Sequence, residues 1–115
     1  MQRKYSSSVR IFYPRFDRET IIKILQKKIQ ALKKELPVSL IVLFGSYAKD
    51  NYTAKSDIDL LVVYRGKVKD AYTKVKKIID IYGTQPHVYS EEEYAAIKPT
   101  VDKMIEKGIV IFKQP

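Results

Sequence analysis

Residues 38–64 read VSLIVLFGSYAKDNYTAKSDIDLLVVY and contain two apolar runs rich in β-branched residues. The run Val38–Phe44 predicts a strand buried on both faces, and the run Asp57–Tyr64 predicts a second central strand. Between them, Gly45-Ser46 opens a tight turn into a short helical segment, and residues 50–56 form a polar loop. This layout lets the second strand lie beside the first, so that the turn after the first strand faces the start of the second.

The segments on either side of these two strands predict helices and further strands. Asp17 is an N-cap candidate for a helix that ends before Pro37. The apolar spacing over residues 68–82 predicts a second long helix with its C-cap at Gly83. Thr84–Tyr89 predicts a third strand.

The C-terminal quarter predicts two short helices and a last strand. Ser90 and Glu93 form a capping box, which starts the first of these helices. Pro99 lies near the start of the second, which ends at Gly108, and Ile109–Phe112 closes the chain as a strand. The pattern predicts an α/β fold in which helices pack on a small sheet, but it does not determine the order of the strands.

The chain has 115 residues, no cysteine, and 22 Lys plus Arg against 13 Asp plus Glu, giving a net charge of +9. This length predicts one domain over residues 1–115, with residues 1–8 as a flexible arm and Val9–Phe16 as a candidate edge strand. The lack of cysteine excludes disulfides, thiolate zinc sites and thiol nucleophiles. Because no apolar run has the length of a membrane span or signal peptide, we expect a soluble, cytoplasmic protein. The positive charge favours a polyanionic partner without specifying which kind.

Asp57 and Asp59 are two carboxylates at the start of a strand that otherwise looks like core. Side chains two residues apart in a strand project to the same face, so these carboxylates are close enough to share a divalent cation. Mg²⁺ relieves the repulsion of such a pair in phosphate chemistry. The alternative is that both belong to a solvated strand end.

Gly45-Ser46 follows a buried strand, where glycine lets backbone N–H groups approach a phosphate closely and the serine hydroxyl adds another donor. By itself, a Gly-Ser pair at this place is more commonly a simple turn. The predicted pairing of the two strands brings this turn toward Asp57 and Asp59, which makes the combination more informative than either part.

The stretches Leu43–Lys49 and Ser56–Val62, with ten residues between Ser46 and Asp57, resemble the signature of minimal nucleotidyltransferases in the DNA polymerase β superfamily. The resemblance covers residues 38–112 and implies a small mixed sheet with helices packed on it, like the palm domain of polymerase β. It implies transfer of a nucleoside monophosphate, AMP from ATP or another nucleoside triphosphate, to an acceptor hydroxyl. Two Mg²⁺ ions would bind to Asp57 and Asp59, and the triphosphate would contact Gly45, Ser46 and Lys49.

The sequence departs from the family pattern at the position of the usual third carboxylate. The matching segment reads His87-Val88-Tyr89-Ser90, which places His87 there. An imidazole can ligate a metal or act as a base, although a lone histidine is more commonly a hydrogen-bonded structural residue. Asp80 is no substitute, because the spacing of residues 68–82 puts it on a helix away from the apolar face. Asp50 replaces a frequent glycine, which alters the loop.

Three functions compete. The first is a Mg²⁺-dependent nucleotidyltransferase that resembles antitoxins acting on a HEPN-type helical toxin, which would bring the acceptor because this short chain has no room for an acceptor-binding domain. The second is a catalytically degenerate module of the same fold that binds a nucleotide or a partner. The third, general nucleic-acid binding, is weaker because the sequence has no known reading motif.

Overall fold

The computed structural model describes residues 17–49, 51–53 and 56–115. The arm at residues 1–8, the candidate edge strand Val9–Phe16 and Asp50 lie outside the described residues. None of the helices in the described part has the length and apolar composition needed to cross a lipid bilayer.

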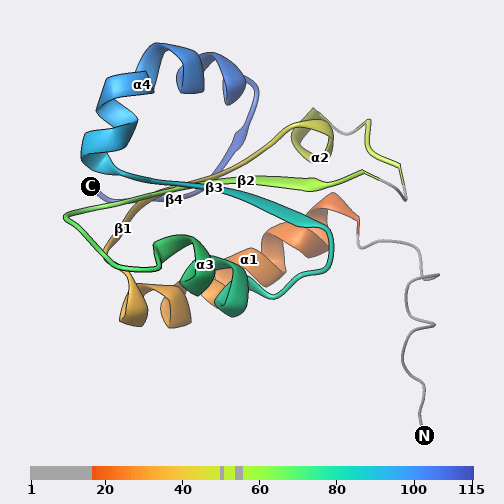
Figure 1. The fold of residues 1–115 in the computed structure, drawn as a ribbon. Helices are drawn as coiled ribbons and strands as arrows, with labels where there is room; N and C mark the ends of the chain where they lie inside the picture. Colours follow the sequence, from red (N-terminus) through yellow and green to blue (C-terminus); the bar gives the residue numbers. More distant parts are fainter. Residues whose placement is uncertain (1–16, 50, 54–55) are drawn as a thin grey trace, which may run out of the picture.

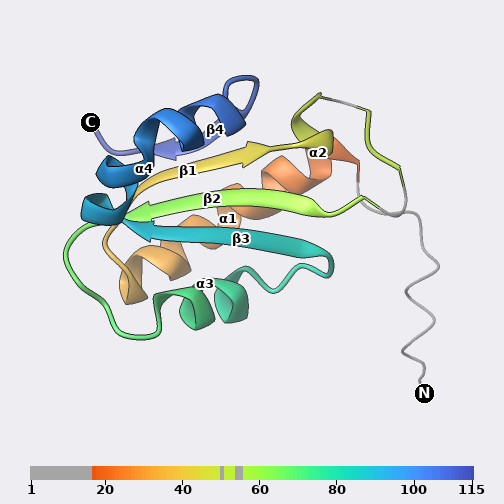
Figure 2. The same cartoon turned by 45° about the horizontal axis from the view of Figure 1, so that its top comes forward.

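A four-stranded sheet forms the centre of the fold, with strand order β3-β2-β1-β4 (Figure 2). Strand β1 pairs antiparallel with both β2 and β4, whereas β2 and β3 are parallel, so the sheet is mixed as the resemblance implied. The strands are β1 (Val38–Phe44), β2 (Ile58–Tyr64), β3 (Thr84–Ser90) and β4 (Ile109–Lys113). The two strands predicted to lie side by side do so, with Phe44 opposite Asp59.

Helices cover both faces of this sheet (Figure 1). Helices α1 (Arg18–Glu35) and α3 (Ala71–Ile79) pack on one face, and α4 (Glu91–Met104) lies over the other. The short helix α2 (Ser46–Lys49) follows β1 at one end of the sheet. The predicted α/β class is therefore confirmed.

The central strands are buried on both faces, as predicted for Val38–Phe44. Ile41 and Leu43 of β1 join the core under α1 and α3, whereas Val42 and Phe44 join a smaller core that includes Val101 of α4. Alternate side chains of β2 divide in the same way, so Asp59 has the parity of the strand positions that face α4. This parity places its carboxylate on that face of the sheet.

Helix α1 begins and ends where the sequence predicts. The Asp17 carboxylate accepts a hydrogen bond from the Thr20 backbone N–H at 2.8 Å, which satisfies one of the free donors of the first turn. At the other end, Leu36 takes an extended conformation before Pro37.

Helix α3 is shorter than the predicted 68–82 segment, and its C-cap is not Gly83. It ends at Ile79 because Asp80 adopts the left-handed conformation, with φ 46° and ψ 46°. Asp70 at the other end is also left-handed, with φ 59°. Aspartate tolerates this region better than most residues, and Gly83 instead has φ +87° in the turn before β3. The apolar spacing thus continues beyond the helix itself.

The two short helices predicted after Ser90 are present as the two halves of α4, which a kink separates. Its capping box is present as predicted, with Ser90 and Glu93 each accepting a backbone N–H of the other. Ile97 is non-helical, with φ −119°, two residues before Pro99, whose ring and missing N–H disrupt the helical ladder. The helix ends at Met104 rather than at Gly108.

Gly108, where the last helix was predicted to end, has a packing role. A Cβ at this position would lie 2.6 Å from Val42 Cγ1 and 2.9 Å from the Leu43 carbonyl oxygen. The glycine therefore lets the chain enter β4 in close contact with β1.

Candidate active site

The candidate site lies at the end of the sheet where β1 leads into α2 and β2 begins. Gly45 has φ +77°, a conformation that L side chains rarely adopt. A Cβ at this glycine would collide with Asp59 Oδ2 and would lie 3.1 Å from Asp59 Cγ. The turn after β1 therefore contacts the Asp59 carboxylate directly, as the strand layout predicted.

Asp59 is partly buried, and its surroundings raise the pKa of its carboxyl. Its side chain is 30% exposed, and its Oδ1 lies 3.8 Å from His87 Nε2. Burial raises the pKa of Asp59, the neighbouring His87 opposes this increase, and the negative charge of Asp57 adds to it. A positively charged group, such as a cation, would therefore bind favourably beside Asp59, because it would stabilise the ionised carboxylate.

Asp57 lies immediately before β2 and is exposed. The next residue is fixed to the sheet, because the Ile58 backbone N–H donates to the Gly83 carbonyl at 2.8 Å. Since the charge of Asp57 contributes to the raised pKa of Asp59, the two carboxylates are electrostatically coupled. The candidate pair thus has one exposed and one partly buried member.

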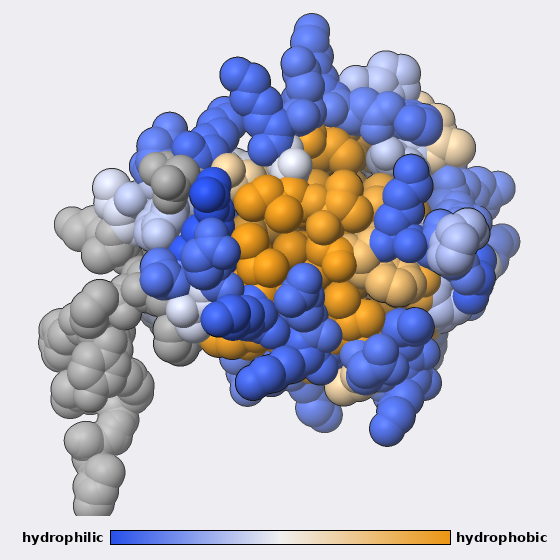
Figure 3. Space-filling model, turned by 180° about the vertical axis from the view of Figure 1, so that it is seen from behind, coloured by the Kyte–Doolittle hydropathy of each residue, from blue (hydrophilic) through white to orange (hydrophobic). Residues whose placement is uncertain are grey.

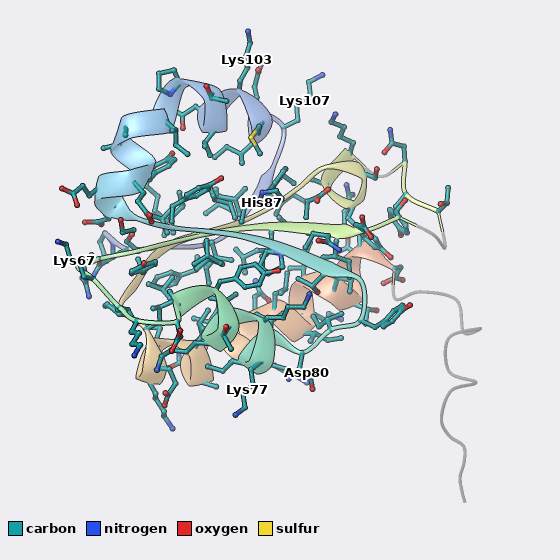
Figure 4. All side chains as sticks on the ribbon, viewed as in Figure 1. Lys67, Lys77, Asp80, His87, Lys103 and Lys107 are labelled. Atoms are coloured by element: carbon teal, nitrogen blue, oxygen red, sulfur yellow. The ribbon has the colours of Figure 1, made fainter. Side chains whose placement is uncertain are left out.

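His87 comes from the middle of β3 and lies on the α4 side of the sheet (Figure 4). In the parallel register it is opposite Leu61, two residues beyond Asp59 on the same face. Its ring also contacts Phe44, with centroids 5.2 Å apart and an interplanar angle of 58°. The structure therefore brings His87 beside Asp59.

The remaining predicted residues have clear positions. Ser46 begins α2, and Lys49 ends it with an exposed side chain, while the Lys49 backbone N–H donates to the Gly45 carbonyl at 3.2 Å. Asp80 is the C-cap of α3 rather than a helical residue, and Figure 4 shows it across the sheet from His87. Asp80 therefore does not complete the site.

A supporting cluster that the sequence did not reveal fixes α2. Arg18 Nη1 donates to the Ala48 carbonyl at 3.0 Å, and the Arg18 backbone N–H donates to the Tyr52 hydroxyl at 3.0 Å. The Tyr52 ring stacks on Tyr47, which is fully buried, at 4.2 Å and 6°. Arg18 is 30 residues from Ala48 and 34 residues from Tyr52 in the sequence, so no local pattern predicts these contacts.

The donor set fits a divalent cation that is shared with a phosphate ligand. Within the described residues, no three His, Asp or Glu side chains cluster closely enough to hold a metal by themselves. Mg²⁺, however, commonly binds through one or two carboxylates plus substrate phosphates, and keeps several waters. Asp57 and Asp59 could supply those carboxylates, because the charge of Asp57 and the burial of Asp59 both disfavour an uncompensated negative charge on Asp59.

Comparison with known proteins gives one family. The model of the nucleotidyltransferase domain family matches residues 25–111. A protein of Methanocaldococcus jannaschii described as a putative protein adenylyltransferase is 30% identical over 94 residues, covering 78% of this chain and 92% of that protein. A second protein of that organism with the same description is 49% identical over 41 residues, so this chain spans only 42% of its length.

Solved structures share the fold at low sequence identity. The crystal structure of a putative nucleotidyltransferase from Sulfolobus solfataricus has a TM-score of 0.57 and 18% identity, covering 96% of this chain and 90% of that one. A Shewanella oneidensis structure of a tri-AMPylated HEPN toxin in complex with an MNT antitoxin gives a TM-score of 0.52 and 20% identity, covering 81% of this chain and 73% of that one. At these identities the similarity concerns the fold.

Proposed function

This chain belongs to the nucleotidyltransferase domain family, and we propose that it transfers AMP from ATP to a hydroxyl group on a partner protein. The choice of AMP is supported by the M. jannaschii relative described as a putative protein adenylyltransferase. The choice of a protein acceptor is supported by the Shewanella structure, whose HEPN toxin is tri-AMPylated.

The contact of Gly45 with Asp59 is the observation that carries this proposal. It places a turn suited to phosphates directly against a carboxylate suited to a cation. Because any Cβ at residue 45 would displace Asp59, the backbone of the turn and the carboxylate can meet the same ligand. A magnesium-bound triphosphate has a cation that the Asp59 carboxylate can bind and negative oxygens that the backbone N–H groups of the turn can bind.

Each side chain then has a separate role. Asp57 and Asp59 would hold Mg²⁺, which when bound supplies positive charge to align the triphosphate and stabilise its leaving oxygens. The Gly45 backbone and the Ser46 hydroxyl would bind phosphate oxygens. Lys49, exposed at the end of α2, would add a positive charge near the triphosphate.

The transfer itself requires a group that accepts a proton. The acceptor oxygen forms a bond to the α-phosphorus, the bond from the α-phosphorus to the bridging oxygen breaks, and pyrophosphate leaves. We assign the hydroxyl proton to His87 Nε2, which lies 3.8 Å from Asp59 Oδ1. A neutral imidazole can accept this proton near neutral pH without adding negative charge to the cation site.

The acceptor would come from a partner of the HEPN type. The domain uses its helices to cover its own sheet, as Figure 1 shows, and the described residues contain no second domain that could present an acceptor. A helical partner that brings its own hydroxyl would complete the reaction by positioning it against the α-phosphorus.

The test is transfer from ATP labelled at the α-phosphate to a co-purified partner protein, with Mg²⁺ present. Asp59→Asn and Asp57→Asn should each lower transfer by at least about a hundredfold, because each removes a charge aimed at the transition state. Asp80→Asn is the matched control: it makes the same change at an exposed position across the sheet, and should keep wild-type transfer. Transfer that survives both site changes contradicts the proposal.

A catalytically degenerate nucleotide-binding or partner-binding module is the second candidate, and the histidine at the third-acid position favours it. In that case the wild type would transfer no label, and His87→Asp would create or greatly increase transfer. If His87 is the base, His87→Asn should lower transfer while leaving ATP binding within about twofold, because the imidazole would act on the acceptor and not on the nucleotide.

A further inference from the structure

Strand β4 is an edge strand of the sheet that the described residues form. It pairs with β1 on one side, and in the part of the chain that the structure describes no strand pairs with its other side. An edge strand presents backbone N–H and C=O groups that can pair with another polypeptide. The residues of β4, Ile-Val-Ile-Phe-Lys, are apolar up to the last one.

The surface around β4 is apolar. Val110 is 56% exposed, and Ile109 and Phe112 are partly buried beside it. Figure 3 views the molecule from the side of β4 and shows one continuous apolar patch at the centre of that face, surrounded by polar residues. A patch of this form on a soluble domain is typical of a protein interface.

Positive charges surround this strand. Lys107 lies two residues before β4, Lys113 is its last residue, and Lys33 Nζ of α1 lies 4.9 Å from the Phe112 ring centroid. These three lysines are exposed. Figure 4 shows Lys107 projecting from the connection between α4 and β4, and Lys103 projecting from the last turn of α4. The acidic residues near the two ends of β4 are Glu106 in that connection and Glu91, which lines a pocket together with Lys113. Two lysines lie near each end, Lys103 and Lys107 at the first and Lys33 and Lys113 at the second, so lysines outnumber these carboxylates at both ends.

This charge pattern disfavours a second copy of the chain as the occupant. Antiparallel pairing of two β4 strands brings the Lys113 end of one copy to the Lys107 end of the other. Parallel pairing brings each end to its own equivalent. In both orientations lysines meet lysines, and like charges opposite one another in a sheet are destabilising. A net charge of +9 on each chain adds to the repulsion.

We propose that β4 is a docking edge for an extended segment of another protein, one with apolar residues at its centre and Asp or Glu at both ends. The backbone of that segment pairs with β4, its apolar side chains cover Val110 and Phe112, and its carboxylates meet Lys107 and Lys113. This inference goes beyond nucleotidyl transfer and does not depend on it.

Docking at β4 also places the partner near the candidate active site. Ile109, the first residue of β4, is paired with Leu43, and Leu43 is followed in β1 by Phe44 and then by the Gly45 turn. A segment that pairs with the other side of β4 therefore has only β4 between itself and β1, the strand that leads into this turn. Neighbouring strands in a sheet lie about 4.8 Å apart. A partner bound there lies beside the end of the sheet that carries Asp59.

The test uses two synthetic peptides of alternating Val and Thr, one with glutamates at both ends and one with lysines. Their binding to the full chain is followed by NMR of the β4 amides. We expect the glutamate peptide to shift these amides at low salt and to lose affinity as salt increases, while the lysine peptide leaves them unchanged. Equal binding of both peptides, no shift of β4 with either, or shifts confined to other elements would overturn the proposal.

Charge reversal supplies the matched control. K107E combined with K113E should weaken the glutamate peptide by about tenfold or more and strengthen the lysine peptide. K67E combined with K77E changes the same number of exposed lysines, on the loop after β2 and on α3, and should leave the affinity within about twofold. Equal weakening by both pairs would mean that only net charge matters, which would contradict a docking edge.

Two further measurements distinguish other occupants. Sedimentation should show a monomer at low and moderate salt; a dimer that Val110→Lys dissociates would make a second copy the occupant and overturn the proposal. Amide exchange in the free chain should be fast for the outward-facing amides of β4. Strong protection of those amides in a monomer would show that the edge is already covered within the chain, which also overturns the proposal. Neither readout depends on transferase activity.

Discussion

At the scale of single residues, the site depends on a glycine whose missing side chain leaves room for a carboxylate. Gly45 has a positive φ and contacts the Asp59 carboxylate directly. Neither feature can be deduced from the sequence at position 45 or position 59 alone. Gly66 has a similar φ of +73° but no atom within 4 Å of a Cβ built on it. Gly66 is therefore a control for Gly45: it has a similar backbone conformation but no contact with the site.

Gly45→Ala and Gly66→Ala should both destabilise the fold by about 1–2 kcal/mol, because each puts a Cβ on a left-handed residue. Only Gly45→Ala should also abolish binding of magnesium-ATP, since its Cβ displaces the Asp59 carboxylate. Urea unfolding measures the first effect and calorimetric titration the second. Normal ATP binding by a folded Gly45→Ala protein would show that the turn and the carboxylate do not act together.

Some of these site residues could be predicted from the sequence and others could not. The turn at Gly45-Ser46 could be predicted to face Asp57 and Asp59, because the two apolar runs and the polar loop between them allow the second strand to lie beside the first. The antiparallel direction of this pair came from the structure. His87 could be assigned to this site only through the family resemblance, and the parallel register of β2 and β3 then brought it to Asp59. Arg18 could not be predicted, because its partners lie 30 and 34 residues away.

At the scale of elements, the connection of α1 to α2 holds the turn that carries the site. Arg18→Gln should cost about 1 kcal/mol of stability, the typical net contribution of one lost hydrogen bond, and should increase amide exchange in α2. ATP affinity should fall while the apparent affinity for Mg²⁺ alone changes little, because Asp57 and Asp59 keep their positions. Arg65→Gln, which changes an exposed arginine in the turn after β2, is the control. Unchanged exchange in α2 after Arg18→Gln would refute this role.

Helix α4 has a side-chain bridge across its kink. The Tyr94 hydroxyl donates to Asp102 Oδ1, and Lys98 Nζ donates to Asp102 Oδ2, each at 2.6 Å. These hydrogen bonds, that of Lys98 first, lower the pKa of Asp102 below its ordinary 3.8. A carboxyl with a lowered folded-state pKa stabilises the fold above its unfolded-state pKa and loses this contribution as the pH falls through the folded-state value.

Asp102→Asn should therefore unfold more readily than the wild type at neutral pH, where the bridge is charged. The difference should shrink below the ordinary pKa of 3.8 and disappear once Asp102 itself is protonated in the folded protein. Urea midpoints of both proteins measured across that range check the sign. A difference that grows toward acid pH would mean that the bridge contributes in another way.

Most elements could be predicted because their signals are local. The strands β1, β2 and β4 and helix α1 match their predicted positions to within a residue or two, since apolar runs, Asp17 and Pro37 each mark a boundary. Helix α3 was predicted too long because apolar spacing cannot show that Asp70 and Asp80 adopt left-handed conformations. The break in α4 was predicted from Pro99 as two short helices, and the structure places it at Ile97, two residues earlier.

At the scale of the whole molecule, the arrangement of the sheet explains where the site lies. The order β3-β2-β1-β4 puts β1 and β2 at the centre, so the end of one and the start of the other are supported on both sides. This order could not be derived from the sequence, because the pairing of β1 with β4 joins segments more than 60 residues apart. The implied resemblance to minimal nucleotidyltransferases is confirmed by the family match and by the shared fold.

Because ATP and Mg²⁺ would bind only the folded molecule, the most direct measurement is the unfolding stability with ATP, GTP, CTP or UTP, each with and without Mg²⁺. At a hundredfold excess over its dissociation constant, a ligand stabilises the fold by about 2.7 kcal/mol. We predict this stabilisation for ATP with Mg²⁺ in the wild type and in Asp80→Asn, and its loss in the Asp57→Asn, Asp59→Asn double variant. Equal stabilisation of the double variant, or no stabilisation of the wild type by any nucleotide, would contradict a magnesium-nucleotide site at Asp57 and Asp59.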